Sequence, residues 1–330
     1  MLQSFEKWMV HSEFARSMTE AVDKTSVAVV RTRIPRATRP DRRKGGRSPV
    51  RDVAFGLCTD QNLPWEEHRD RWRYFESLGF ASLWDCDHYQ QPSRPNGNYF
   101  EGWTLLAALA TETTSARVGV LVTSNTFRHP ALVAKMAATV DHISGGRLEV
   151  GLGAGWFAPE HEWFGLPFPE PPELVARFRE AVQIVDSMLR EEVTSFDGRY
   201  YRLTNAPARP APVQKPRPPL TLGAHGRQML RIVAEYADRW NSHGKPDEIA
   251  NRNAILDEHC MAIGRDPASI TRSLYVWSAQ VPTDIWSSFD AFEEMVGVYM
   301  EAGIREFIVD SPNTEQFPVL EKVASRVIGK

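Results

Sequence analysis

The chain has 330 residues, of which 42% are hydrophobic and 25% are charged, and its formal net charge is -3 at pH 7. This composition is typical of one large globular domain, and it gives no global attraction to nucleic acid or to an anionic membrane surface. The three cysteines, Cys58, Cys86 and Cys260, are too scattered for a disulfide framework or a zinc knuckle. No stretch approaches the roughly 18 apolar residues of a membrane-spanning helix, and the N-terminus has no secretory signal pattern. We therefore expect a cytoplasmic protein that acts on a small molecule.

The segment 1–52 differs in composition from the rest of the chain. Between residues 31 and 51 arginines are frequent, Asp41 is the one acid, and prolines and paired glycines interrupt the sequence. Such a composition cannot bury a core. We predict that residues 1–52 form a basic, disordered leader and that residues 53–330 form the folded domain. A basic arm for a polyanion is the alternative.

From residue 53 onward, short apolar segments alternate with segments of helical periodicity. The first apolar segment, 53–58, precedes a helix pattern that contains Trp65, Trp72 and Phe75 and ends at Gly79. The further predicted strands lie at 80–88, 116–125, 147–155, 220–226, 239–244, 273–281 and 306–310. The further predicted helices lie at 102–113, 130–143, 173–190, 229–238, 248–264, 289–303 and 317–328. A hairpin is expected around Asp197 and Gly198.

Eight strands that are each followed by a helix predict an α/β protein with the (β/α)8 TIM-barrel fold, whose helical crossovers make the strands parallel. The Pro-rich insertion after the fourth strand, residues 156–172, shows no helical pattern before residue 173. An open doubly wound sheet is the alternative, but the regular units leave no obvious switch point. In a barrel the active site lies at the carboxyl ends of the strands, which is where we place the candidate residues.

A glycine-rich segment, residues 151–157, follows the fourth predicted strand. Its glycines are spaced G-x-G-x-G, whereas a dinucleotide fingerprint has G-x-G-x-x-G and opens a helix at once. At a barrel rim, residues without a Cβ atom let a flat ring lie against the backbone, and Trp156 could wall that space. The alternative is that the glycines only fit a tapering barrel. The candidate cofactor-binding residues of this segment are Gly153, Ala154, Gly155 and Trp156.

The segment 223–227 follows the fifth predicted strand and opens a helix. The free N–H groups and the positive end of that helix suit a phosphate, and Arg227 adds counter-charge. A scaffold role is the alternative, because any helix that follows a glycine would look similar. The candidate phosphate-binding residues are Gly223, Ala224, His225, Gly226 and Arg227.

Asp87 and His88 lie together at the end of the second predicted strand. A histidine there can donate or accept a proton near neutral pH, and a neighbouring carboxylate can orient it, so we predict His88 as general acid/base and Asp87 as its partner. A hydrogen-bonded scaffold histidine is the alternative. A metal site is a weaker alternative, because its candidate ligands lack the HExxH spacing. We therefore predict no metal. Those ligands would be Asp85, Asp87, His88, His161 and Glu162.

The chain also resembles a known family. The matching stretches, in order, are SLWDCDH, FEGWTLLAALATET, RVGVLVTSNTFRHPALVAKMAATVDHISGGRLEVGLGAGWF, FDGRYYRL, PVQKPRPPLTLGAHG and AEYADRWN. They are similar to the bacterial luciferase-like flavin and deazaflavin oxidoreductases, and the block 117–157 is the most specific part of the match. Within it, DHISGGRLEVGLGAGWF is closely similar to the branch that uses coenzyme F420. The resemblance implies a TIM barrel with the cofactor across the strand ends, and hydride transfer between F420 and a small organic substrate.

The resemblance also implies roles for particular residues. In the F420 branch an Asp-His pair faces the reactive carbon of the ring, and it corresponds to Asp87 and His88. A non-prolyl cis peptide that supports the ring is expected near Leu121 and Val122, with Thr123 next to it, and we take these three as cofactor-binding. Some deazaflavin sugar-phosphate dehydrogenases carry a glutamate at the position of Trp156, which argues against a sugar-phosphate substrate here.

The family leaves other functions open. Some members are two-component monooxygenases that bind reduced FMN and oxygen and depend on a flavin reductase, and others are non-enzymatic flavin binders. F420 is the cofactor that we predict, and FMN is the alternative. Because members are often dimers, the resemblance also implies a possible homodimer.

Overall fold

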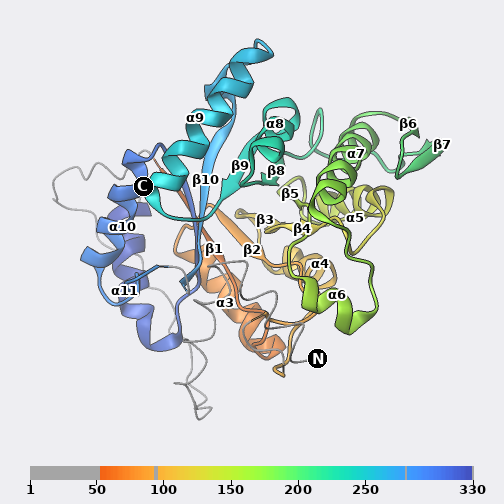
Figure 1. The fold of residues 1–330 in the computed structure, drawn as a ribbon. Coiled ribbons are helices and arrows are strands. Elements are labelled where there is room, and N and C mark those ends of the chain that lie inside the picture. Colours follow the sequence, from red (N-terminus) through yellow and green to blue (C-terminus); the bar gives the residue numbers. More distant parts are fainter. Residues whose placement is uncertain (1–52, 93–95, 279–280, 329–330) are drawn as a thin grey trace.

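The computed structural model describes residues 53–92, 96–278 and 281–328. The predicted basic leader, residues 1–52, lies outside the described residues. The described chain forms a barrel of strands with helices around it (Figure 1). Among the described residues, no helix combines the length and the apolar character that crossing a membrane requires.

The central sheet is a closed parallel barrel. β1 pairs in parallel with both β2 and β11, and β3 pairs in parallel with both β2 and β5, so the ring of strands has no free edge. The short strand β4 continues the barrel strand begun by β3. This closure confirms the TIM barrel and shows that the open doubly wound alternative is wrong. The strands are β1 (Ala54–Cys58), β2 (Ser82–Asp85), β3 (Arg117–Val120), β4 (Thr123–Ser124), β5 (Leu148–Gly153), β8 (Leu220–Gly223), β9 (Arg239–Ser242), β10 (Thr271–Val276) and β11 (Glu306–Asp310).

Helices cover the outside of the barrel, and a two-stranded hairpin projects beside α7 (Figure 1). The hairpin joins β6 (Val193–Asp197) to β7 (Arg202–Pro207), as predicted. The α-helices are α3 (Trp65–Ser77), α4 (Gly102–Glu112), α5 (Pro130–Ile143), α6 (Ala158–Phe164), α7 (Pro171–Arg190), α8 (Arg227–Tyr236), α9 (Pro246–Ala262), α10 (Phe289–Glu301) and α11 (Phe317–Val323). Shorter helical turns are η2 (Pro267–Ser269), η4 (Thr314–Gln316) and η5 (Ala324–Ile328).

The amphipathic pattern of the helices explains their packing. In α7, Leu174, Phe178, Val182 and Val185 recur at intervals of three and four residues, and all four are buried. Three- and four-residue spacing places side chains on one face of a helix, so this face packs inward.

One sequence prediction about the insertion is wrong. The sequence of 156–172 predicts no helix, yet α6 begins at Ala158, soon after the glycines. Pro159 hides the pattern, because proline usually interrupts a helix, but it is tolerated in the first turn, where its missing N–H has no intrahelical partner. Gly165 ends the helix in the left-handed conformation, with φ of 67°. This short helix has a functional consequence, because it contains Glu160.

The end of the barrel at which the strands begin is closed by ion pairs. Glu149 of β5 accepts hydrogen bonds from Arg117 of β3 and Arg239 of β9, and Arg239 also pairs with Glu306 of β11 at 2.6 Å. Both carboxylates are almost completely buried. A buried charge needs a paired partner, so these contacts tie strands from opposite parts of the sequence together. The opposite end, where the strands finish, carries the candidate site.

A buried histidine on α3 makes the stability of the fold sensitive to acid. His68 has no exposed surface, and burial lowers its pKa from 6.5 to about 4. Between these pH values the unfolded chain binds a proton at this position and the folded chain does not, so the free energy of unfolding falls as the pH falls from 6.5 to 4. We expect the His68→Gln variant to lose less of its melting temperature across this range, by an amount equivalent to about 3 kcal/mol at most.

The matched control is His142→Gln, because His142 is exposed on α5. Thermal melts of the three proteins from neutral to acid pH test the assignment. Equal losses of melting temperature in the His68→Gln variant and the unchanged protein would show that His68 does not carry the acid sensitivity.

Candidate active site

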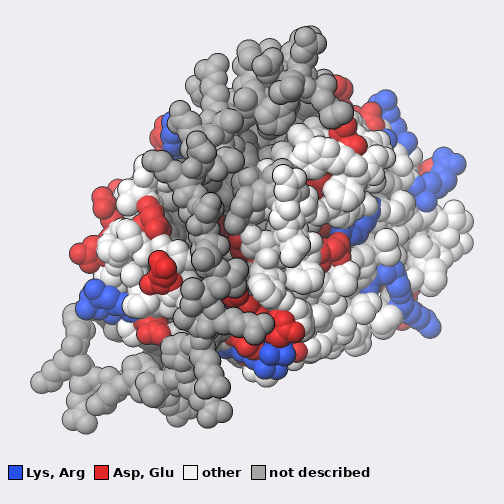
Figure 2. Space-filling view, turned by 90° about the horizontal axis from the view of Figure 1, so that it is seen from below, with Lys and Arg blue, Asp and Glu red and all other residues white. Residues whose placement is uncertain are grey.

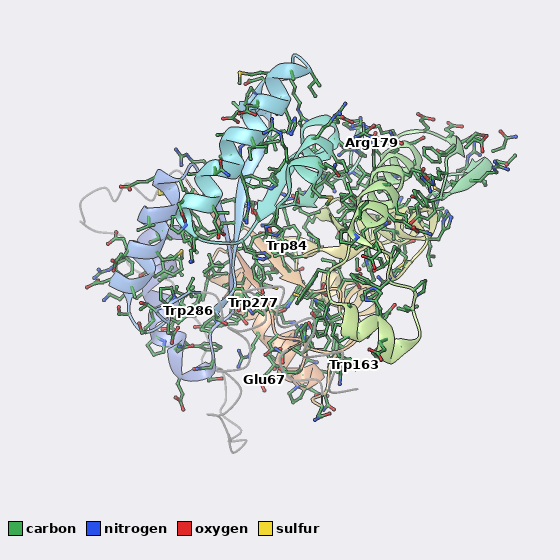
Figure 3. All side chains as sticks on the ribbon, viewed as in Figure 1. Glu67, Trp84, Trp163, Arg179, Trp277 and Trp286 are labelled. Atoms are coloured by element: carbon green, nitrogen blue, oxygen red, sulfur yellow. The ribbon has the colours of Figure 1, made fainter. Side chains whose placement is uncertain are left out.

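The mouth of the barrel gathers polar and aromatic side chains from several strands. Trp84 of β2 lies fully buried within the barrel, and Trp277, directly after β10, lies near its mouth (Figure 3). Trp156 and Trp277 have ring centroids 6.5 Å apart, and Trp156 is also edge-on to His88 at 5.6 Å. Residues after β2, β5 and β10 therefore lie close together at this end.

His88 is oriented by a buried carboxylate from α6. Its Nδ1 lies 2.8 Å from Glu160 Oε2, and the Glu160 side chain is completely buried. The other carboxylate oxygen of Glu160 accepts hydrogen bonds from the backbone N–H groups of Tyr89 and Gln90. Because a carboxylate only accepts, the hydrogen of the neutral ring lies on Nδ1, and Nε2 is the basic nitrogen. Nε2 makes no hydrogen bond within the described part of the chain, so it is available to a ligand.

The Asp87 carboxylate is hydrogen-bonded to Arg128 and Ser124 and not to the His88 ring, which differs from the predicted pairing. Arg128 forms a two-pronged ion pair with Asp87, at 2.7 and 2.9 Å, and the backbone N–H of Ser124 donates to Asp87 Oδ2 at 2.7 Å. Arg128 also donates to Glu101. Successive side chains in an extended segment point in opposite directions, so neighbours in sequence need not be partners in space. Asp87 thus connects β2 to the loop that follows β4.

A cis peptide bond joins Leu121 to Val122, at the position that the resemblance implied. It lies between β3 and β4, within one strand of the barrel. A Cβ atom added to Gly153 or to Gly223 would lie 2.6 or 2.9 Å from Val122 Cγ2. These two glycines, on β5 and β8, therefore make room for the Val122 side chain, which gives them a structural role whether or not a ring lies above them.

The other predicted cofactor-binding residues of this region differ in burial and in their contacts. Thr123 is buried, and its hydroxyl accepts a hydrogen bond from the Trp103 indole at 3.0 Å. Gly155 has φ of 93°, and a Cβ there would lie 2.8 Å from Thr126 Oγ1, so both its conformation and its surroundings favour glycine. Ala154 packs against the core. Trp156 remains 39% exposed.

The loop after β8 leads into α8 with free backbone groups. Gly226 is the N-cap of α8, no side chain caps the helix, and no atom lies within 4 Å of a Cβ placed on Gly226. The N–H groups of the first turn therefore lack intrahelical partners beside open space, which suits an anion. Ala224 is built into the barrel wall through its N–H bond to Asn241 O, at 3.1 Å.

The ionisable side chains near α8 have different partners. Arg227 pairs with Glu258 of α9 at 2.8 Å, and both side chains are more than half exposed. Arg252 donates to the carbonyl oxygen of His243 at 2.6 Å and lies near Ser242, whose hydroxyl contacts His225 Nδ1. Burial lowers the pKa of His225 well below its ordinary value, and that of His243 to about 4. Both imidazoles are therefore neutral at pH 7.

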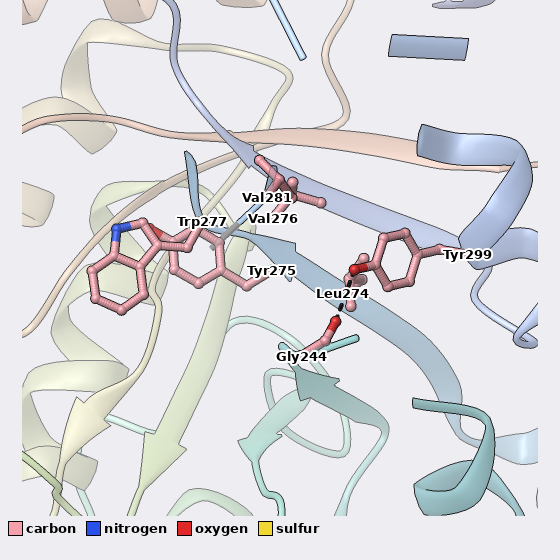
Figure 4. A pocket seen from close by; sticks show the side chains of 7 residues that line it. All are labelled: Gly244, Leu274, Tyr275, Val276, Trp277, Val281 and Tyr299. Atoms are coloured by element: carbon pink, nitrogen blue, oxygen red, sulfur yellow. Dashed lines mark hydrogen bonds between the residues drawn. The ribbon is translucent and has the colours of Figure 1, made fainter. Parts of the chain in front are cut away.

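A small pocket at the end of β10 is too small for an organic ligand. Its volume is about 10 Å³, which is room for one water molecule (Figure 4). The Tyr299 hydroxyl donates to the Gly244 carbonyl oxygen at 2.8 Å across it. Its lining residues are Gly244, Leu274, Tyr275, Val276, Trp277, Val281 and Tyr299.

The metal alternative gains no support from the described residues, where no cluster of metal-ligating side chains is present. His161 Nε2 contacts Thr126 Oγ1 at 2.6 Å, and His161 Nδ1 contacts the Phe157 carbonyl oxygen at 2.9 Å. Asp87 is paired with Arg128, and Glu162 is exposed. His161 and Asp87 are thus engaged separately, whereas Asp85 is buried and neither of its carboxylate oxygens has a hydrogen-bond partner among the described residues.

Comparison with known proteins identifies the family. Residues 50–303 match the family described as luciferase-like monooxygenase. The chain belongs to this family. The match covers most of the barrel and confirms the predicted resemblance.

Relatives within the luciferase-like monooxygenase family include F420-dependent oxidoreductases. An F420-dependent glucose-6-phosphate dehydrogenase of Microbacterium testaceum (strain StLB037) is 30% identical over 194 residues, which are 58% of this chain and 57% of that protein. An F420-dependent hydroxymycolic acid dehydrogenase of Mycobacterium tuberculosis is 30% identical over 201 residues, which are 59% of this chain and 54% of that protein. This chain therefore spans less than two thirds of the length of these relatives.

A solved structure agrees with the fold of the luciferase-like monooxygenase family. It is an F420-dependent secondary alcohol dehydrogenase in complex with an F420-acetone adduct. It superposes with a TM-score of 0.73 at 19% sequence identity, covering 84% of this chain and 99% of that one. At this identity the likeness establishes the barrel alone.

Sequence reasoning missed three residues of this family member's candidate site. Glu160 orients His88, Arg128 holds Asp87, and Arg252 lies behind the loop after β8. Glu160 lies 72 residues from His88, and Arg128 lies 41 from Asp87. A buried carboxylate in a helix that contains no other buried acid would have been the signal for Glu160, but α6 itself was not predicted.

Proposed function

We propose that the protein is an F420-dependent oxidoreductase that transfers a hydride between the deazaflavin and an uncharged, largely apolar alcohol or carbonyl compound. The observation that carries this proposal is the His88 ring, which is fixed by Glu160 through Nδ1 and has its Nε2 free at the mouth of the barrel. A general acid/base must be within reach of its substrate and held in one tautomer. Glu160 supplies the second condition.

The residues at the strand ends fit a flat ring with a phosphate-bearing tail. Leu121, Val122, Gly153 and Gly223 form an apolar, backbone-rich surface beside the strand that leads to His88, and a larger residue at either glycine would displace Val122. The free N–H groups at Gly226 lie in open space where an anion is favoured. We propose that these residues hold the cofactor together with Thr123, Ala154, Gly155, Trp156, Ala224 and His225. Arg227 is proposed as a counter-charge that exchanges Glu258 for the phosphate.

A bound deazaflavin supplies a carbon that donates or accepts a hydride and reacts little with oxygen. His88 handles the proton that accompanies this transfer. During oxidation of an alcohol, Nε2 accepts the hydroxyl proton, and during reduction of a carbonyl compound it returns a proton to the oxygen. Glu160 keeps Nδ1 as the donor throughout, so the ring presents the same nitrogen in both directions. Arg128 and Asp87 pair with each other and fix the loop after β4.

The surroundings of His88 favour an apolar substrate. Trp156, Trp163 and Phe164 are 39, 49 and 52% exposed, although large aromatic side chains are usually well buried. Trp163 packs on Phe157, whose ring lies 6.3 Å from the His88 ring. Figure 2 shows the molecule from the side on which α6 lies, and uncharged residues form a broad part of this face.

The pairing of the arginine beside His88 also favours an uncharged substrate. Among the described residues, the arginine that contacts the Asp87–His88 segment is Arg128, and its guanidinium is already paired with Asp87 and Glu101. A phosphate on the substrate would need a cation with free donors. Trp156 stands where some sugar-phosphate dehydrogenases of the family carry a glutamate. The name of one relative, a hydroxymycolic acid dehydrogenase, is consistent with an apolar alcohol.

Steady-state assays with F420 test the proposed substrate class. We expect kcat/KM for octan-2-ol, or for octan-2-one with reduced F420, to exceed that for glucose 6-phosphate. The Trp163→Ala variant should raise KM for the octyl substrate by about 10-fold, because burying a large apolar side chain is worth roughly 1.5–3 kcal/mol. Its KM for propan-2-ol should change little.

The control is Leu132→Ala, which removes an exposed apolar side chain from a different helix, α5. This variant should behave like the unchanged protein with both alcohols. A preference for glucose 6-phosphate, or equal effects of the Trp163 and Leu132 substitutions, would contradict an apolar substrate.

A further inference from the structure

Two cysteine thiols lie in contact at the mouth of the barrel. Cys58 is the last residue of β1, and Cys86 follows β2, the strand beside it. Their sulfur atoms are 3.5 Å apart. Neither cysteine has a role in the proposed hydride transfer, and both are free.

The pair is next to the proposed cofactor surface. Cys58 packs in one apolar cluster with Leu121, and Cys86 and Val122 pack against that cluster. Leu121 and Val122 are the residues joined by the cis peptide. Cys86 also directly precedes Asp87 and His88 in the chain. A change at the two sulfurs would therefore act where the ring is proposed to lie.

The two thiols differ in accessibility. Cys58 is only 4% exposed, whereas Cys86 is partly exposed. A hydrogen bond with Cys86, together with burial, raises the pKa of the Cys58 thiol well above its ordinary value. An oxidant therefore reaches Cys86 first, and Cys58 is placed to react with the oxidised sulfur. The third cysteine, Cys260, is fully buried in α9, in the main core.

We propose that Cys58 and Cys86 are an oxidation site that closes to a disulfide when a peroxide reaches the mouth of the barrel, and that a bound cofactor shields it. The disulfide chemistry stands on the cysteine pair alone. The shielding rests on the proposed function, because it requires the cofactor to lie on the Leu121–Val122 surface.

The oxidation proceeds in two balanced steps. The Cys86 sulfur attacks hydrogen peroxide, which gives the sulfenic acid of Cys86 and one water molecule. The Cys58 sulfur then attacks the sulfenic sulfur and forms the S–S bond, and the sulfenic hydroxyl leaves with the Cys58 thiol proton as a second water molecule. Overall, two thiols lose two protons and two electrons, and these reduce one peroxide to two waters. A dithiol reductant reverses the change.

Closure must shift the chain on the Cys86 side. A disulfide has an S–S distance of about 2.05 Å, so the sulfurs must approach by about 1.5 Å. Cys58 is held in the barrel between β2 and β11, and its carbonyl accepts a bond from Ser311 N–H at 2.8 Å. Cys86 lies beyond the end of β2, and its N–H is held by the Gln61 side chain at 2.6 Å. The movement therefore falls on Cys86, whose N–H is held by a side chain and not by a strand, and we expect weaker binding of F420.

Mass spectrometry of the peroxide-treated full chain tests the oxidation site. The expected product has lost two hydrogens and contains a peptide in which Cys58 is linked to Cys86, and dithiothreitol restores the original mass. The Cys260→Ser variant should form the same link, and the Cys58→Ser and Cys86→Ser variants should not. If the unchanged protein keeps three free thiols, or links Cys260, the proposal is wrong. This readout on the unchanged protein decides the matter even if a serine variant fails to fold.

A second experiment tests the shielding. Saturation with F420, verified by titration in the same buffer, should slow the loss of the two thiols at least 10-fold, and the disulfide form should bind F420 at least 10-fold more weakly. Thiol loss at an unchanged rate in protein that has bound F420 would overturn the shielding. Failure of F420 to bind the reduced protein would instead count against the proposed function, and the linkage result would stand without it.

Discussion

Replacing His88 with alanine is expected to lower kcat by about 100-fold or more, because a positioned acid/base contributes roughly 10²–10⁴-fold to a proton transfer. The loss should appear in kcat and leave the affinity for F420 within a few-fold, since the ring of His88 acts on the substrate oxygen. The Glu160→Gln variant is the informative companion. Its amide side chain retains an oxygen near Nδ1 but also presents an NH₂ group, so it permits both tautomers of His88, and we expect an intermediate loss of kcat.

Steady-state kinetics with saturating F420, together with a cofactor titration of each variant, separates the two effects. The Glu162→Gln variant is the matched control, because Glu162 is exposed on the same helix, and it should retain full activity. A His88→Ala variant with normal kcat would remove His88 from the mechanism. A Glu160→Gln variant indistinguishable from the Glu162→Gln variant would show that the buried carboxylate does not orient the ring.

Replacing Asp87 with alanine is expected to destabilise the fold by about 1–3 kcal/mol, because buried donors of the Arg128 guanidinium and the Ser124 N–H lose their acceptor. Arg128 is 10% exposed, and Glu101 would remain as its other ion-pair partner. Urea unfolding measures the loss. The Asp87→Asn variant, which retains one carbonyl oxygen for these donors, should lose less stability.

This prediction separates the role of Asp87 in the structure from the one that its place in the sequence suggested. If Asp87 oriented His88, its replacement by asparagine would lower kcat as much as the Glu160→Gln substitution and leave stability unchanged. We expect the reverse order, with stability affected and kcat close to normal in the Asp87→Asn variant. A fully stable Asp87→Ala variant would contradict the assignment of the Asp87–Arg128 pair as the anchor of the loop after β4.

The sequence predicted the framework of the protein better than the partners within the site. The alternation of apolar strands and amphipathic helices depends on local periodicity, and it identified the barrel, the hairpin around Asp197 and the strand ends. The resemblance placed a cis peptide near Leu121 and Val122, where the structure has one. The pairing of His88 with Glu160 depends instead on how the chain after β5 turns back over β2, and no local pattern records it.

The glycines of β5 and β8 are a second case in which the sequence pattern did not predict the contacts. Their spacing suggested a surface for a flat ring, but spacing alone cannot show which atoms lie opposite a missing Cβ. The structure places the Val122 side chain against Gly153 and Gly223. The glycines therefore make room in the barrel for the Leu121–Val122 segment. That this segment contacts a cofactor remains our proposal.

The central claim is that this mouth binds a deazaflavin for hydride transfer. Titration of the purified protein with F420 and, separately, with FMN, followed by the absorbance or fluorescence of each cofactor, tests it most directly. We predict micromolar affinity for F420 and much weaker binding of FMN. Tight binding of reduced FMN with little affinity for F420 would contradict the claim, move the protein to the oxygen-using monooxygenases and remove the proposed role of His88.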